Sequence, residues 1–454
     1  MILRICTPIL FVICLLPSWS QAKEPQNKFL NIQVVNTDGG LTAWLVEDHS
    51  IPIIAMEFAF KGAGSKNNNA ALQGLARLAS NTMDEGAGDL TSQEFQKQLR
   101  DKSISLSFGV SRDHFSGSLK TLTKNKEDAF HLLTLALTKP RFDQDALDRM
   151  RDSNKSRIKS SISNPRWIAA RIQNDKLFEG HPYALNSGGT LSTLDKITPA
   201  DLKEFHKTLG KNQLVIAVSG DITAAELKET LSKTFGSIPT VKTTESNKEP
   251  LRNLGKTYLY EQNIPQSSIE IAQPGINRKD KDYYAAYVMN FILGESGFGS
   301  RLMDVIREKR GLTYGVYSYF RQYDEMDTLN VTTSTVNKSV PEMISLIHQE
   351  WDKMKNEPVS EQELSEAKSY LIGSLPLSLT STSSIAAILL SLQLDELPVD
   401  YLDTRAEKIN AVQINDIQSA AQRLLDTQKM LTVIVGAPVG LENAETVTTL
   451  PNVE

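Results

Sequence analysis

Leu214-Val215-Ile216-Ala217-Val218-Ser219-Gly220 is an apolar run that ends at a glycine, and Met430-Leu431-Thr432-Val433-Ile434-Val435-Gly436 repeats it in the second half of the chain. Short runs of aliphatic and β-branched residues that stop at glycine predict buried strands. Similar helix starts precede the two runs, Ile197-Thr198-Pro199-Ala200-Asp201 in the first half and Val412-Gln413-Ile414-Asn415-Asp416 in the second. Landmarks that recur in the same order predict an internal duplication.

Further pairs of segments follow the same order. Alternating residues predict a strand from Ile53 to Phe60, and a second one from Ser268 to Ala272. Asp143 and Ser360 each stand where a helix N-cap is expected, with acids in the following turn. Strands that are segregated from helices predict an α+β fold. We therefore expect two similar domains, each a mixed sheet with helices packed on one face, at residues 23–240 and 255–454, joined by a linker at 241–254.

Composition bounds the function. A chain of 454 residues exceeds one ordinary core, and its net charge of −5 argues against nucleic acid as the main partner. Arg4, the apolar run from Ile9 to Leu16 and a small-x-small pattern ending at Ala22 predict a cleaved signal peptide over residues 1–22. That run is too short for a membrane span, and an uncleaved anchor is the alternative reading. Both cysteines, Cys6 and Cys14, lie within the predicted signal peptide, so the mature chain has no thiol, and we expect a periplasmic protein.

The segment Gly74 to Asn81 has the surroundings of a zinc-binding H-x-x-E-H helix without its ligands. Arg77, Ser80 and Asn81 stand where that motif places its two histidines and its glutamate. Zinc binds neutral imidazole, thiolate or carboxylate, and a guanidinium keeps its positive charge. We therefore expect no metal at these three degenerate positions and no cofactor in this chain.

The repeat and several motifs together resemble the M16 peptidase family, in its two-domain branch that includes mitochondrial processing peptidase. The motifs are Gly74-x-Ala76, His181-Pro182-Tyr183, Gly188-Gly189-Thr190-Leu191, Gly299-Ser300-Arg301-Leu302 and, as the most specific, Ile306-Arg307-Glu308-Lys309-Arg310-Gly311-Leu312-Thr313-Tyr314. In this family a third zinc ligand, a glutamate, comes from a long helix further along the chain. The corresponding region, Ser153 to Pro165, contains no acidic residue, and near Ser156 to Ile158 it offers only a hydroxyl, a cation and a hydrocarbon.

Other chemistry has little support. No two of the six histidines (His49, His114, His131, His181, His206 and His348) are spaced for a shared helical metal site, and His181 reads as a structural loop residue. No Gly-x-Ser-x-Gly elbow occurs, and Gly294 to Gly299 lacks the lysine of a phosphate-binding loop. The apolar run from Ile385 to Leu394 predicts a buried core helix.

Of the functional residues that the resemblance implies, this sequence keeps Arg307 and Tyr314. In active members an arginine and a tyrosine with this spacing help to hold the substrate backbone and the oxyanion. The resemblance therefore implies a periplasmic non-catalytic subunit that binds unstructured peptides together with a zinc-bearing M16 homologue. The alternatives are a peptide-binding or scaffold protein without an enzymatic complex, and a self-sufficient peptidase with unusual ligands. The sequence leaves open whether the chain forms a homodimer when that partner is absent.

Overall fold

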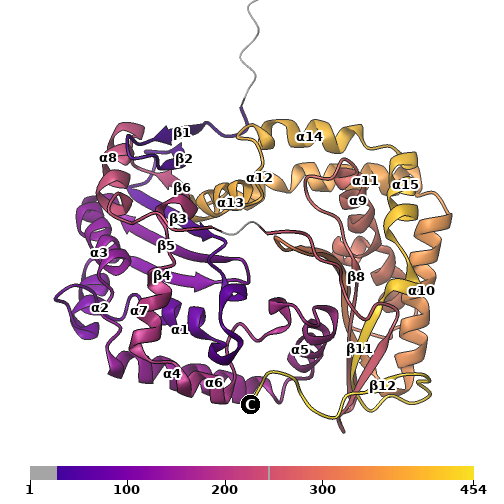
Figure 1. Ribbon diagram of the computed structural model, residues 1–454. Coiled ribbons are helices and arrows are strands. Elements are labelled where there is room, and N and C mark those ends of the chain that lie inside the picture. Colours follow the sequence, from indigo (N-terminus) through magenta and orange to yellow (C-terminus); the bar gives the residue numbers. More distant parts are fainter. Residues whose placement is uncertain (1–27, 244–245) are drawn as a thin grey trace, which may run out of the picture.

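Two six-stranded mixed sheets organise the protein, one in each half of the chain (Figure 1). The computed structural model describes residues 28–243 and 246–454, so the predicted signal peptide at 1–22 lies outside the described residues. The first sheet contains β1 (Ile32–Asn36), β2 (Thr42–Glu47), β3 (Ile53–Lys61), β4 (Ser105–Val110), β5 (His114–Leu122) and β6 (Leu214–Gly220). The second contains β7 (Thr257–Glu261), β8 (Gln266–Pro274), β9 (Val316–Gln322), β10 (Asp327–Val336), β11 (Leu431–Gly436) and β12 (Glu445–Thr446).

The two sheets have the same topology. Their strand orders are β1-β2-β6-β3-β5-β4 and β12-β7-β11-β8-β10-β9. In each half the strand that ends at the repeated glycine lies inside the sheet, parallel to the half's early strand (β2 or β7) and antiparallel to the next (β3 or β8). This equivalence confirms the predicted α+β class and the two similar domains. The described part of the 241–254 segment contains neither helix nor strand, and the domain boundaries themselves stay a prediction.

Alternate side chains of β3 point to the same face of the first sheet and contribute to a hydrophobic core. Ile54, Met56, Phe58 and Phe60 are buried in the first hydrophobic core, together with helical side chains of the same half. The helices of the first half are α1 (Leu75–Thr82), α2 (Ser92–Asp101), α3 (Lys126–Thr138), α4 (Gln144–Ser161), α5 (Pro165–Leu177), α6 (Leu191–Lys196), α7 (Pro199–His206) and α8 (Ala224–Phe235). Those of the second half are α9 (Tyr283–Asn290), α10 (Val340–Asn356), α11 (Glu361–Gly373), α12 (Leu375–Ser378), α13 (Thr382–Leu394), α14 (Tyr401–Ala411) and α15 (Ile414–Leu424).

The predicted helix starts are confirmed, with one difference in detail. Ser360 caps α11 through a capping box with Glu363. Asp143 is the N-cap of α4, but its carboxylate accepts a hydrogen bond from Arg141 Nε at 2.6 Å instead of capping the helix. A neighbouring arginine therefore competes successfully with the backbone for this carboxylate.

The halves exchange one helix each. In Figure 1, α13 of the second half lies beside the first sheet, and α5 of the first half lies beside the second sheet. Leu389, Leu390 and Leu392 of α13 pack with Trp44 and Ala217 of the first sheet. The apolar run at 385–394 is thus a buried helix as predicted, but the core that it completes belongs to the other half.

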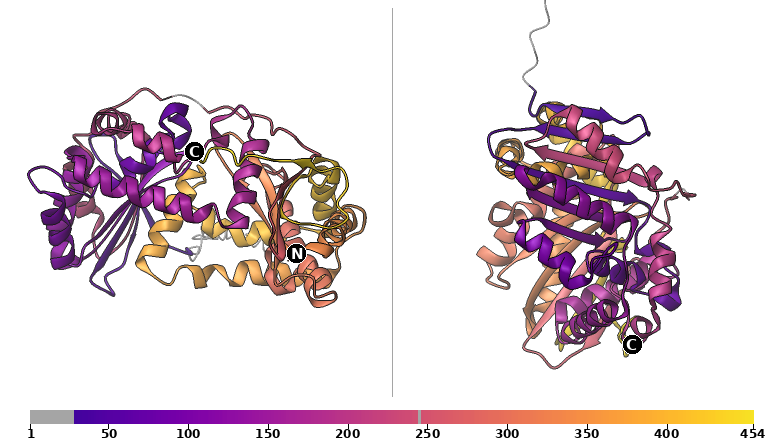
Figure 2. Two further views of the ribbon diagram at one scale, coloured as in Figure 1. Left: turned by 90° about the horizontal axis from the view of Figure 1, so that it is seen from below. Right: turned by 90° about the vertical axis from the view of Figure 1, so that its left-hand side faces the viewer.

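Helix α5 makes the reciprocal contact. Its residues Ile168 and Ile172 pack with Leu431 and Val433 of β11. The inner face of each sheet, which the predicted one-sided packing left uncovered, therefore receives a helix from the opposite half. This exchange joins the halves through two hydrophobic clusters in addition to the linker, and Figure 2 shows the resulting close association from two further directions. Among the described helices, none combines the length and the apolar character needed to cross a membrane.

Candidate functional site

Helix α1 carries the three degenerate metal positions. It begins after Gly74, whose φ of 92° is a left-handed conformation that suits glycine. A Cβ atom at Gly74 would also stand 2.8 Å from the Cα atom of Gly189, so only glycine fits this approach. The Gly188-Gly189 motif and the start of α1 are therefore parts of one packed junction, which sets the position of Arg77, Ser80 and Asn81.

The first two degenerate positions are engaged within the first half. Arg77 Nη2 donates to the carbonyl oxygen of Val110 at 3.0 Å, at the end of the edge strand β4. Burial, together with the nearby charge of Arg157, lowers the pKa of Arg77 below its usual value. Ser80 is buried, and its hydroxyl donates to the carbonyl oxygen of Arg77 at 2.8 Å. Neither side chain presents an atom that would serve as a zinc ligand.

The third degenerate position, Asn81, faces a residue that the sequence motifs did not single out. Asn154 Nδ2 on α4 donates to Asn81 Oδ1 at 3.1 Å, and Asn154 is only 4% exposed. The predicted region of α4 does lie against α1, but the facing side chain is Asn154, just before the Ser156 to Ile158 neighbourhood. Asn154 is one of many polar residues in α4, so no sequence signal singled it out.

These residues do not fit a zinc ion. The set is a guanidinium, a hydroxyl and two amides, and the hydrogen bonds above already engage each of them. Over residues 28–243 and 246–454, the structure places no group of three or more His, Cys, Asp or Glu side chains where they could hold a metal. The side chains of this site therefore support no zinc-dependent step.

The second half contains Arg307 and Tyr314. Arg307 belongs to the π-helical segment η8 (Met303–Glu308), a geometry that often accompanies functional sites. Its guanidinium forms an ion pair with Glu308 and lies over the ring of Phe298, 4.5 Å from the ring centroid. Tyr314 follows in a loop that turns at Gly311, where φ is 64°. Its side chain is 89% exposed.

Phe298 is the residue of this region that the sequence motifs did not indicate as a functional group. It stands in the 3-10 turn η7 (Gly297–Gly299) and is 70% exposed. The turn is held by Ser300, whose amide and hydroxyl both donate to the carbonyl oxygen of Gly297. An aromatic residue between two glycines was the sequence signal. Arg307 and Phe298 are in contact, and we refer to these two residues together with the exposed Tyr314 as the aromatic-arginine group.

The structure does not bring the two sets of predicted residues together. Arg77, Ser80 and Asn81 bond to residues of the first half, whereas Arg307 contacts Glu308 and Phe298 of the second half. Within the described residues, no hydrogen bond or ion pair joins one set to the other. The aromatic-arginine group is therefore not part of a completed site inside this chain.

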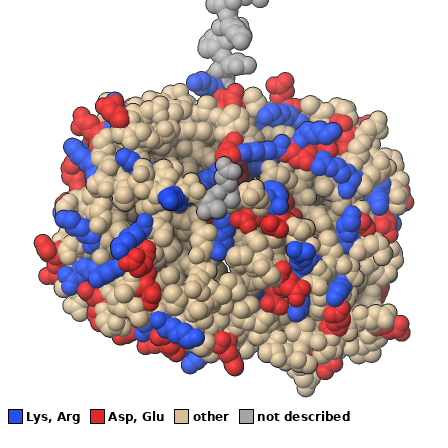
Figure 3. Space-filling model, in the orientation of Figure 1, with Lys and Arg blue, Asp and Glu red and all other residues tan. Residues whose placement is uncertain are grey.

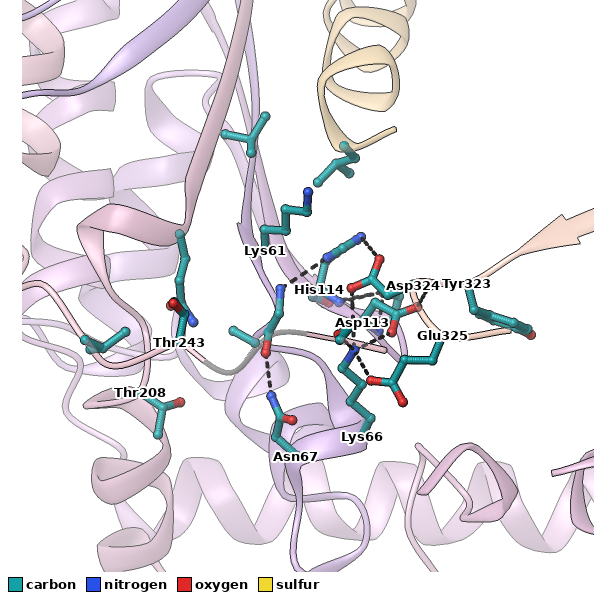
Figure 4. A pocket seen from close by; sticks show the side chains of 18 of the residues that line it. Lys61, Lys66, Asn67, Asp113, His114, Thr208, Thr243, Tyr323, Asp324 and Glu325 are labelled. Atoms are coloured by element: carbon teal, nitrogen blue, oxygen red, sulfur yellow. Dashed lines mark hydrogen bonds and ion pairs between the residues drawn. The ribbon is translucent and has the colours of Figure 1, made fainter. Parts of the chain in front are cut away.

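A large cavity lies between the halves. Its volume is about 1500 Å³, and Figure 4 shows it from close by. Lys66, whose side chain is 7% exposed, lies there between Asp113 at 3.1 Å, Glu325 at 2.8 Å and Asp324 at 3.5 Å. Asp324 and Glu325 come from the turn between β9 and β10 of the second half. We call these four residues the interdomain ion cluster.

Electrostatics fix the charge states in the interdomain ion cluster. Burial alone would lower the pKa of Lys66, but its hydrogen bond to Glu325 and the charge of Asp113 outweigh burial and raise it. Burial likewise opposes ionisation of Glu325, yet hydrogen bonds from Lys66 and His181 keep its pKa below the usual value. The lysine and this carboxylate are therefore charged, and they join the halves by buried ion pairs.

The His181-Pro182-Tyr183 motif serves this junction. His181 Nε2 lies 2.6 Å from Glu325 Oε2, and the Tyr183 hydroxyl bonds to Asp113. Burial, followed by the charge of Asp113, raises the pKa of Tyr183, so its hydroxyl stays protonated as a donor. The prediction that His181 is structural agrees with this geometry, but its partner is 144 positions away in the sequence. Local sequence could not indicate that pairing.

Charges of both signs are interspersed over the face of the molecule seen in Figure 3. Acidic and basic side chains are mixed on this face, and the net charge of the whole chain is −5. Such a surface does not favour a nucleic acid backbone.

Comparisons with known proteins agree with the fold and with the missing ligands. Residues 196–371 match a family model described as "Peptidase M16 inactive domain". The "Non-peptidase homolog YmxG" of Helicobacter pylori is 28% identical over 389 residues, which cover 84% of this chain and 89% of that protein. The "Probable inactive metalloprotease YmfF" of Bacillus subtilis is 24% identical over 428 residues, covering 88% and 97%. A peptidase M16 inactive domain from Pseudomonas fluorescens has a similar structure, with a TM-score of 0.85 at 28% identity, covering 91% of this chain and 100% of that chain.

Together these matches confirm the predicted resemblance to the M16 peptidase family. The proteins that it resembles here are described as inactive or non-peptidase homologues, and its own motif positions hold Arg77, Ser80 and Asn81.

Proposed function

We propose that this chain is the zinc-free subunit of a periplasmic M16 endopeptidase. A homologous zinc-bearing chain would be its partner, and unstructured peptides would be the substrates of the pair. In that complex Arg307 and Tyr314 would complete the partner's active site. The chain alone would not hydrolyse peptides, because it supplies neither a metal ligand set nor a base at the motif positions.

The observation that carries this proposal is the contrast between the two sets of residues. Arg77, Ser80 and Asn81 are engaged in internal hydrogen bonds, whereas the phenol of Tyr314 is almost fully exposed. A guanidinium and a phenol are hydrogen-bond donors that can be directed at a carbonyl oxygen as negative charge develops on it. An exposed phenol that makes no part of a site within this chain favours a role in a site that another chain completes.

Extended peptide binding is also supported by chemistry. A substrate held through backbone hydrogen bonds needs donors such as Arg307 and Tyr314 that do not read side chains. The exposed ring of Phe298 offers an apolar surface next to Arg307. A scaffold role without an enzymatic complex remains the alternative, in which the aromatic-arginine group would have no catalytic effect.

The experiment is reconstitution. The chain without residues 1–22 is purified alone and together with the zinc-bearing homologue, and cleavage of an unstructured fluorogenic peptide is measured with and without a zinc chelator. We expect activity only from the pair. Arg307→Ala should lower kcat/KM of the pair by about 100-fold to 1000-fold, the usual effect of removing an oxyanion donor.

A matched control is Arg310→Ala. Arg310 is a nearby arginine of the same segment whose guanidinium pairs with Glu342, and we expect its removal to leave cleavage nearly unchanged. Zinc-dependent cleavage by the isolated chain would contradict the proposal. A stable but inactive pair would favour the scaffold alternative.

A further inference from the structure

The C-terminal segment of the chain crosses from the second half to the first. It leaves the second sheet at β12, which pairs in parallel with β7, and the amide of Val447 donates to the carbonyl oxygen of Leu259 at 2.8 Å. Residues 448 and 449 are exposed. In Figure 1 the yellow segment then runs below α5 and ends beside α6 of the first half. The end of the second half thus lies on the surface of the first.

Val453 is the apolar anchor of this crossing. It is 4% exposed and belongs to the hydrophobic core of the first half, among residues of β3, α1 and α6. Its carbonyl oxygen accepts a hydrogen bond from the amide of Leu191 at 2.8 Å. Leu450, two residues before Asn452, packs against this core and against the cluster that α5 forms with the second sheet. Burial of this kind requires a recess that matches the segment.

Asn452 forms the side-chain hydrogen bonds between the C-terminal segment and the first half. Its side-chain oxygen accepts from Gln73 Nε2 at 3.3 Å, and its backbone oxygen accepts from Asn186 Nδ2 at 3.1 Å. Its side-chain nitrogen donates to the carbonyl oxygen of Ala184 at 3.4 Å and lies 3.5 Å from a carboxylate oxygen of Asp175. A φ of 53° also suits asparagine at this position. Both side-chain polar atoms of Asn452 therefore form hydrogen bonds with residues of the first half.

Two of the residues that bond to Asn452, Gln73 and Asn186, are also hydrogen-bonded within the first half. The amide of Asn186 donates to Gln73 Oε1 at 3.0 Å, and the hydroxyl of Thr193 donates to the carbonyl oxygen of Gln73 at 2.9 Å. Gln73 directly precedes Gly74 at the start of α1. A binding surface whose polar groups are positioned before the ligand arrives loses less entropy on binding. Residues of the first half therefore help to hold Gln73 and Asn186 in position for Asn452.

We propose that the first half contains a peptide-binding groove formed by the 184–191 loop, Gln73 and Asp175, and that residues 450–453 of this chain occupy it. Its ligand class is a short peptide that turns at an asparagine and continues into an aliphatic residue. Because the groove includes Gln73, which precedes the N-cap Gly74 of α1, its occupancy connects the second sheet to the helix with the degenerate metal positions. This inference does not depend on a partner subunit or on peptidase activity.

The test removes the segment and returns it as a separate peptide. A chain that ends at residue 447 is titrated with a fluorescent synthetic peptide of residues 447–454, and binding is followed by anisotropy. We expect saturable binding that unlabelled peptide displaces. Peptides with Asn452→Ala or Val453→Asp should bind at least about tenfold more weakly, since one buried aliphatic side chain or one set of buried hydrogen bonds is worth that much.

Two controls keep the result interpretable. A peptide with Glu454→Gln alters an exposed position and should bind like the native sequence. If the shortened chain does not fold, a full-length variant with a protease site in place of Thr448 and Thr449 is cleaved after folding, and exchange of the nicked segment for labelled peptide is measured. Absence of saturable binding or exchange at millimolar peptide, or equal binding of the Val453→Asp peptide, would overturn the proposal.

Discussion

Asn154 Nδ2 donates a hydrogen bond to Asn81 Oδ1 at 3.1 Å, and this amide pair joins α4 to α1 at the degenerate metal positions. The contact shows which residue of α4 faces the helix that an M16 peptidase uses for zinc. A single hydrogen bond between neutral groups thus stands where a metal-bound relative would need charged or imidazole ligands. This geometry suggests a direct test of whether α1 and α4 can still position zinc ligands.

Restoring three ligands should restore metal binding. The variant Arg77→His, Asn81→His, Asn154→Glu places two imidazoles at helical i, i+4 spacing and a carboxylate on the facing helix, which is a known zinc ligand set. We expect about one zinc ion per chain after dialysis, measured by elemental analysis. The two histidine substitutions without Asn154→Glu should retain much less. Equal zinc content in both variants would show that Asn154 does not face the metal position. No hydrolysis is expected from the triple variant, because Ser80 cannot act as a general base.

Phe298 should influence the reconstituted peptidase through Arg307. The ring lies 4.5 Å from the guanidinium carbon, and an exposed contact of this kind is worth about 0.5–1 kcal/mol. Phe298→Ala should therefore lower kcat/KM of the pair about threefold to fivefold. Phe298→Tyr retains the aromatic face and should preserve activity. Loss of activity in both variants would show that the contact between the aromatic face and the Arg307 guanidinium does not explain the effect, because Phe298→Tyr retains that contact.

Lys66 should be needed for stability. Its buried ammonium is shared by Asp113, Asp324 and Glu325, so Lys66→Met leaves three carboxylates without their common cation. We expect the free energy of unfolding to fall by roughly 3–5 kcal/mol, measured by urea denaturation. Lys97→Met is the matched control, because Lys97 is an exposed partner of Asp101 and its loss should cost less than about 0.5 kcal/mol. Similar losses from both substitutions would show that the interdomain ion cluster does not stabilise the fold.

Glu270 should make stability depend on pH. Burial raises the pKa of this β8 carboxyl from 4.5 to about 7. Between these two values the folded state holds a proton that the unfolded state has released, so stability falls as pH rises from about 5 to about 8. The shift corresponds to roughly 3 kcal/mol at most. Glu270→Gln should flatten this part of the stability curve and stabilise the protein at pH 8, as measured by urea denaturation across that range.

Glu57 offers an internal comparison for this effect. It occupies the equivalent place on β3, opposite Ala217 of β6, as Glu270 on β8 is opposite Val433 of β11. Burial also raises the pKa of Glu57 to about 7, but its side chain is less enclosed than that of Glu270. Glu57→Gln should change the pH dependence in the same direction and by a smaller amount. A stability curve that both substitutions leave unchanged would contradict the assignment of this dependence to the two carboxyls.

Much of the architecture could be predicted because its signals are local. The strands that end at Gly220 and Gly436 were visible as apolar runs, since a buried strand needs hydrophobic side chains along a few consecutive residues. Ser360 could be recognised as a cap because its capping partner, Glu363, is three residues away. The loss of zinc ligands was equally visible, because the chemistry of Arg77, Ser80 and Asn81 does not depend on the fold.

Helix α13 shows where sequence reasoning stops. Its hydrophobicity indicated burial, but an apolar helix carries no information about which sheet will cover it. The structure places Leu389 of α13 against the sheet of the other half. The same limit applies to Asn154, whose partner Asn81 is 73 positions away.

The sequence by itself thus determined the duplication, the strand and helix types, and the absence of a zinc ligand set at α1, because each follows from residue chemistry and short-range periodicity. Only the tertiary structure decided that the halves exchange α5 and α13, that Lys66 joins carboxylates of both halves, and that Val453 is buried in the opposite core. These contacts join residues far apart in the chain. Their partners are selected by the packing of whole sheets and helices, which no local pattern encodes.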